Sequence, residues 1–177
     1  MSFGPTIAPF RPAATMPPQT TWAFFRWAVE GAWPGILWAT FWSAAAGSLE
    51  AISATILGRV VDAANTTAPE AVFQEHFWLF ALVLGFYLIL RPTVFGISTS
   101  ATSITLEPNL FPLILSRIHR WTIGQAVTFF DNDFAGRIAQ KQMQVARATT
   151  DVVSGMVETM SFSLASVVGS VALLMAI

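Results

Sequence analysis

The chain has 177 residues, of which 54% are hydrophobic and 11% are charged, whereas an ordinary soluble domain is charged at roughly a quarter of its positions. The 15 Phe and 7 Trp residues and a mean hydropathy of +0.60 predict an integral membrane protein. A net charge of −1 offers no basic surface, so nucleic acid is not an expected partner. The lack of cysteine excludes disulfides and thiol catalysis. With only His76 and His119, far apart in the sequence, no metal site is expected.

The N-terminal segment differs in composition from the rest. Residues 1–18 contain five of the ten prolines and one charge, Arg11, which predicts a flexible cytoplasmic tail without regular structure. Residues 19–177 are predicted to form the membrane domain. At its start, Trp22 and Trp27 flank Arg26 in a short aromatic segment. This pattern fits a helix in the headgroup layer, or equally the cytosolic end of the first span.

Three segments are long and apolar enough to cross a bilayer, which takes roughly 20 residues. They are residues 33–57, 77–97 and 152–177, which predicts an all-α, polytopic bundle of membrane helices. After the second span the helix is expected to continue to residue 118, with a distortion at Pro108 and Pro112.

The charge distribution predicts how the chain is oriented. Residues 117–147 hold five of the nine basic residues, so this segment and the N-terminus are expected in the cytoplasm and the polar connection at 58–75 outside. The last span ends without an aromatic or basic anchor, which suggests that the sequence is truncated.

Two charged residues lie within the predicted spans. Glu50 is in the first and Arg91 is late in the second. Charges in a span are costly and usually face a bundle interior or a water-filled cavity, so both are candidate cavity or substrate residues. Alternatively, Glu50 lies near a boundary or pairs with a basic residue, and Arg91 reaches an interface or meets a carboxylate.

The longest polar stretch of the chain is residues 127–147. Phe129 and Phe130 precede Asp131-Asn132-Asp133, whose side chains suit the start of a helix that continues from Phe134. A calcium loop would need further ligands downstream and a closing Glu, which this sequence lacks.

These residues resemble the start of the membrane domain of an ATP-binding-cassette (ABC) exporter. The resemblance rests on Leu57-Gly58-Arg59-Val60-Val61-Asp62, on Phe129-Phe130-Asp131 and on Gly136-Arg137-Ile138. After Ile138 the sequence departs from the usual pattern, which leaves the subfamily open.

The resemblance implies three of six spans, in a multi-pass protein of a bacterial inner membrane. It implies a second half-transporter, identical or different, and a nucleotide-binding domain outside this segment that binds ATP and Mg²⁺. The residues expected to contact that domain, as a coupling helix, are Val127, Thr128, Phe129, Phe130, Asp131, Asn132 and Asp133.

Two other functions remain open. The chain contains no G-x-x-x-x-G-K-[ST] phosphate-binding loop and no Ser/His/Asp arrangement, so no catalytic residue is expected in it. A three-span membrane scaffold is one alternative to the exporter. The other is part of an ion-driven transporter that uses Glu50 and Glu158. The substrate does not follow from the sequence.

Overall fold

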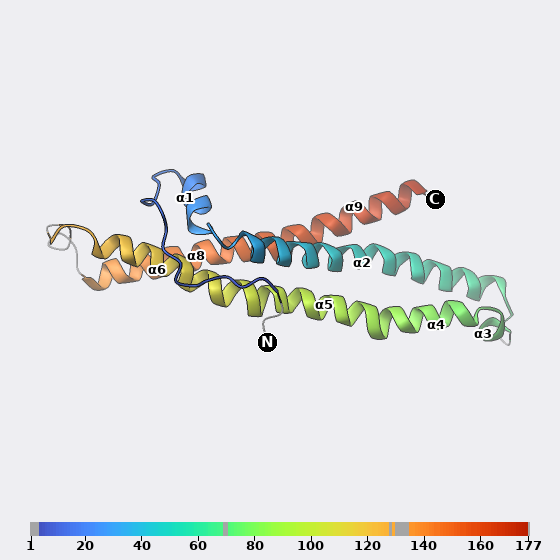
Figure 1. The fold of residues 1–177 in the computed structure, drawn as a ribbon. Coiled ribbons are helices and arrows are strands. Elements are labelled where there is room, and N and C mark those ends of the chain that lie inside the picture. The colour runs from blue at the N-terminus through green and yellow to red at the C-terminus, as the bar shows by residue number, and fades with distance from the viewer. Residues whose placement is uncertain (1–3, 69–70, 128, 130–134, 177) are drawn as a thin grey trace. The chain divides into compact units, whose positions relative to one another are not determined.

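The computed structural model describes residues 4–68, 71–127, 129 and 135–176, and these residues form helices and connections without a strand. Figure 1 shows the helices in chain order. Their bounds are α1 Thr21–Ala28, α2 Trp33–Thr66, α3 Val72–Glu75, α4 Phe77–Gly85, η1 Phe86–Leu90, α5 Arg91–Ser100, η2 Ala101–Leu106, α6 Glu107–Ile123, α8 Ala135–Gly155, η3 Met156–Met160 and α9 Ser161–Ala176, where η marks a π-helical segment.

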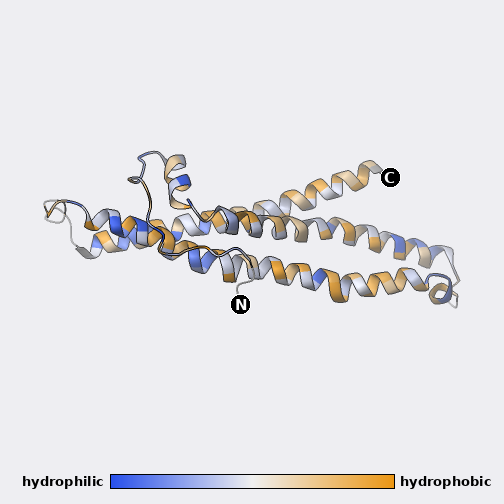
Figure 2. Cartoon of the chain, in the orientation of Figure 1, coloured by the Kyte–Doolittle hydropathy of each residue, from blue (hydrophilic) through white to orange (hydrophobic). Residues whose placement is uncertain are grey.

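Three helical stretches are long and apolar enough to cross a membrane: Trp33–Thr66, Phe77–Ile123 and Gly136–Met175. The first two contain a predicted span and extend beyond it, and the third begins well before the predicted span 152–177 and covers that span as far as Met175. Residues 58–66, expected in a polar connection, continue α2 instead, because this stretch has no proline and its only glycine is Gly58. Figure 2 shows apolar residues dominating α4 and α9, whereas polar residues gather on α6 and α8.

The described residues divide into two compact units. Unit 1 comprises Met1–Ala39 and Ser100–Val157, and it contains α1, α6 and α8. Unit 2 comprises Thr40–Thr99 and Glu158–Ile177, and it contains most of α2, α4, η1 and α9.

The core of unit 1 follows one stripe of α6 and the π-helical turn before it. Leu106, Leu110, Leu113 and Ile114 are almost completely buried, and their spacing places them on one face of a helix. They pack in one cluster with Trp27 of α1 and with residues of α8. The amphipathic pattern of α6 thus explains why α1 and α8 pack on it.

The described residues of the N-terminal segment, 4–18, belong to unit 1 and contact its helices, whereas the sequence predicted a flexible tail. Ile7 is 4% exposed. The Trp27 indole N–H donates to the Thr15 carbonyl at 2.9 Å, and the Arg117 guanidinium donates to the Arg11 carbonyl at 3.2 Å. Prolines prevent regular structure but leave these carbonyl acceptors available, so the segment is held by partners that its composition does not reveal.

Small residues bring α2 and α9 close together in unit 2. Ser43, Gly47 and Ala51 recur every four residues and therefore lie on one face of α2. A Cβ on Gly47 would overlap the Phe162 carbonyl oxygen, and a Cβ on Gly169 would lie 3.0 Å from the Cβ of Ala51. This contact therefore requires glycine at position 47.

Two π-helical segments precede prolines. The segment η1 ends two residues before Pro92, and η2 ends two residues before Pro108. Proline removes one backbone donor and clashes with the preceding turn, and a wider π turn accommodates both effects. The distortion expected at Pro108 is therefore confirmed, whereas Pro112 lies inside the regular helix α6.

Candidate functional site

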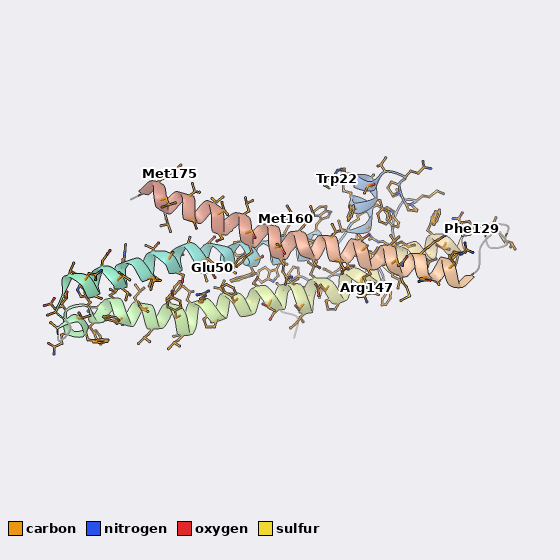
Figure 3. The ribbon with its side chains drawn as sticks, turned by 180° about the vertical axis from the view of Figure 1, so that it is seen from behind. Trp22, Glu50, Phe129, Arg147, Met160 and Met175 are labelled. Atoms are coloured by element: carbon orange, nitrogen blue, oxygen red, sulfur yellow. The ribbon has the colours of Figure 1, made fainter. Side chains whose placement is uncertain are left out.

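Glu50 and Arg91, predicted separately from the sequence, form an ion pair in unit 2. The Arg91 Nη2 donates to Glu50 Oε1 at 2.7 Å, and the side chains are 33% and 34% exposed, respectively. Figure 3 labels Glu50, which lies part-way along α2. Of the alternatives that the sequence left open, pairing of the carboxylate with a basic residue is the one found.

Aromatic rings surround the guanidinium of Arg91. Its Cζ atom lies 5.7 Å from the centre of the Tyr87 ring and 5.5 Å from that of Phe95. A guanidinium at these distances is attracted to the negative face of a ring, and the attraction grows where water is excluded. The two rings therefore stabilise the charge of Arg91 in an apolar helix.

A second polar contact continues the ion pair along the same two helices. The hydroxyls of Ser53 and Tyr87 are 2.5 Å apart. Glu50 and Ser53 are three residues apart on α2, and Tyr87 and Arg91 are four apart on the facing helix, so each pair shares a helix face. These four residues, which we call the polar ladder, fix the register of α2 against η1 and the start of α5.

The polar ladder joins two helices through an ion pair and a contact between two hydroxyls. The carboxylate and the guanidinium are each other's counter-ions, and both side chains remain partly exposed. The ladder contains no nucleophile with an adjacent base, and its chemistry is that of binding and positioning.

The expected coupling segment is described only at Val127 and Phe129; Thr128, Phe130, Asp131, Asn132 and Asp133 lie outside the described residues. Val127 is 77% exposed and Phe129 is 41% exposed. Figure 3 shows Phe129 in the connection between α6 and α8. Both described positions are thus accessible to a partner.

Arg117 of α6 forms a buried polar centre in unit 1 that the sequence does not predict. It is 3% exposed, and its guanidinium donates to four backbone carbonyls. The acceptors are Arg11 at 3.2 Å, Trp27 at 2.7 Å, Ala28 at 3.1 Å and Glu30 at 2.7 Å. Three of these carbonyls belong to the C-terminal end of α1 or follow it, where helical carbonyls lack partners.

The sequence contains a signal for two of the residues that were not predicted, Ser53 and Tyr87, but none for Arg117. Ser53 and Tyr87 lie at helical spacing from Glu50 and Arg91, so helix periodicity around each charge would have found them. Arg117 has no such signal, because its acceptors are backbone carbonyls, which every residue carries. It was counted only among the basic residues of an expected cytoplasmic segment.

The described helices and the charged pair between two apolar helices define the class of an all-helical integral membrane protein. Over 108 residues, 60% of the chain, the sequence is 35% identical to an "Uncharacterized ABC transporter ATP-binding protein" of Haemophilus influenzae. The matched region is 17% of that protein's length. No protein-family model matches the chain, and no solved structure matches it. The similarity indicates a relation to ABC transporters.

Proposed function

We propose that this chain is the N-terminal part of the membrane domain of an ATP-driven ABC exporter. The observation that carries the proposal is the 35% identity to a protein named as an ABC transporter ATP-binding protein, in a chain with three helices suited to cross a membrane. The sequence contains no phosphate-binding glycine loop, so the residues of this chain do not form a site for ATP and Mg²⁺. Nucleotide chemistry is therefore assigned to a separate nucleotide-binding domain.

In this proposal, the connection between α6 and α8 transmits movement. Val127 to Asp133 would dock on the nucleotide-binding domain, with Phe129 filling an apolar pocket of that partner. The exposure of Phe129 and its place in the connection that follows a long, continuous helix support this role. Closure of the nucleotide-binding domains would then tilt the membrane helices, which alternately open a cavity between two half-transporters.

The polar ladder would hold one arrangement of the membrane helices. Glu50, one of the two carboxylates that the ion-driven alternative would use, is paired with Arg91. We favour ATP-driven transport over ion-driven transport because the similar protein is named as an ABC transporter ATP-binding protein.

The proposal predicts that Phe129→Ala separates ATP hydrolysis from transport. The gene product that contains this chain would be prepared in inside-out vesicles and supplied with a panel of fluorescent amphiphiles. We expect vanadate-sensitive ATP hydrolysis to persist in the variant while ATP-dependent uptake falls about tenfold or more, since truncating a central aromatic anchor typically costs at least 1–2 kcal/mol.

The matched control is Ile123→Ala, which truncates an apolar side chain of α6 that is 62% exposed and lies outside the expected docking segment. This variant should retain both activities. Unchanged uptake in Phe129→Ala would contradict the coupling role, and the absence of ATP hydrolysis from the wild-type protein would contradict the proposed function itself.

A further inference from the structure

Unit 2 contains an apolar groove that the proposed function does not use. Its volume is about 640 Å³, within the range of roughly 300–1,000 Å³ typical of small-molecule sites. The groove is open on one side, and α2, α4, η1 and α9 contribute its lining. Among the residues that line the groove are Ile52, Ile56, Arg59, Gly85, Phe86 and Leu173.

Arg59 gives the groove two chemically different parts. It is the one charged residue among those that line the groove, and within the described part of the chain no hydrogen bond or ion pair involves its side chain. The other lining groups are aliphatic or aromatic, apart from the hydroxyl of Thr55. A ligand that fits must therefore join an apolar chain to an anionic group.

We propose that this groove binds one acyl chain of an anionic phospholipid, with the lipid phosphate on Arg59. A guanidinium binds phosphate through paired N–H donors. Arg59 lies just beyond the predicted span at 33–57, where a lipid headgroup would be. The inference requires only that these helices lie in a bilayer; it does not depend on ATP-driven transport.

Gly85 creates the space into which the acyl chain fits. A Cβ at this position would meet no atom within 4 Å, so a larger side chain can enter the groove without disturbing the helices. Gly96 is equally open and lies on the same continuous helix, but it is not among the residues that line the groove. Gly85→Leu and Gly96→Leu are therefore a matched pair of variants.

The test is native mass spectrometry of the gene product that contains this chain, delipidated in detergent and titrated with phosphatidylglycerol or, separately, phosphatidylcholine. We expect saturable retention of phosphatidylglycerol in preference to phosphatidylcholine. Arg59→Gln should weaken retention about tenfold, the loss expected for one charge-assisted contact. Gly85→Leu should abolish the saturable step, whereas Gly96→Leu and Arg120→Gln should bind as the wild type does.

Three results would overturn the inference. Equal retention of both lipids by all variants would show that the protein binds only annular lipid, without a specific site in the groove. Loss of binding in Gly96→Leu as well as in Gly85→Leu would show a general effect of leucine on the helix. A wild-type protein that retains no phosphatidylglycerol would show that other helices or a second copy fill the groove. Because Arg59→Gln and Gly85→Leu act on different ends of the site, either variant tests the inference if the other fails to fold.

Discussion

The Glu50–Arg91 pair combines two opposing electrostatic effects. Removing two charges from water costs several kcal/mol, and only close geometry and further contacts offset that cost. Here the charged atoms are 2.7 Å apart and two aromatic rings lie within 6 Å of the guanidinium. About a third of each side chain remains exposed, which lowers both the desolvation cost and the attraction between the two charges. We therefore expect a larger loss of stability when one partner is removed than when both are.

Arg91→Gln is therefore predicted to destabilise the protein more than the double variant Glu50→Gln/Arg91→Gln. The single change leaves a carboxylate without its counter-ion, at a cost of about 1–3 kcal/mol, whereas the double change removes both charges. Thermal unfolding in detergent, followed by tryptophan fluorescence, measures the difference. Additive effects of the two single variants in a double-mutant cycle would contradict coupling between these residues.

At the residue scale, the sequence predicted the charged members of the polar ladder but not the whole ladder. Glu50 and Arg91 stand out because charges are rare in apolar spans. Their pairing was one of several alternatives, since sequence does not show how two spans are aligned. Ser53 and Tyr87 are common residue types in such spans, and only the 2.5 Å contact between their hydroxyls shows that they belong to the polar ladder.

At the scale of elements, α1 is held by side chains far from it in the sequence. The helix α1 comprises Thr21–Ala28, and Thr20 precedes it without a side-chain capping bond. The carbonyls at its other end are satisfied by Arg117. Gly31 then adopts a φ of 83°, a conformation that favours glycine. The C-terminal end of α1 is thus fixed more firmly than its start.

Arg117→Met is predicted to loosen α1 and the segment before it. Methionine fills similar space but donates no hydrogen bonds, so three carbonyls at and just after the end of α1 lose their charged donor, at a cost of about 2 kcal/mol or more. Trypsin cleavage after Arg26, within α1, followed by mass spectrometry, should be several-fold faster in the variant. Arg120→Met, which changes an exposed residue of the same helix, is the control.

Equal cleavage rates in Arg117→Met and the wild type would contradict this account of Arg117. Arg117→Lys should give an intermediate rate, because an ammonium reaches fewer acceptors at once than the planar guanidinium does. The sequence predicted α1 from its aromatic pattern. It could not predict the packing of residues 4–18, which depends on backbone acceptors.

At the scale of the whole molecule, hydropathy predicted the three membrane helices but underestimated their length. Composition marks where a helix leaves an apolar environment, whereas the helix itself continues until glycine, proline or packing ends it. The extensions of Phe77–Ile123 and Gly136–Met175 carry the polar part of unit 1. The assignment to ABC transporters came from short motifs, and the identity to the Haemophilus influenzae protein supports that relation.

We propose that this chain works with an ATP-binding partner through the connection between α6 and α8. The most direct measurement replaces Phe129 with the photo-crosslinker p-benzoylphenylalanine in the gene product, in native membranes. Peptide mass spectrometry then identifies the attached segment. Trp22, which is 80% exposed on α1, receives the same crosslinker as a control. The account predicts that position 129 attaches to a segment of a nucleotide-binding domain and that position 22 does not. Attachment of position 129 only to lipid or to segments without a nucleotide-binding sequence would contradict it.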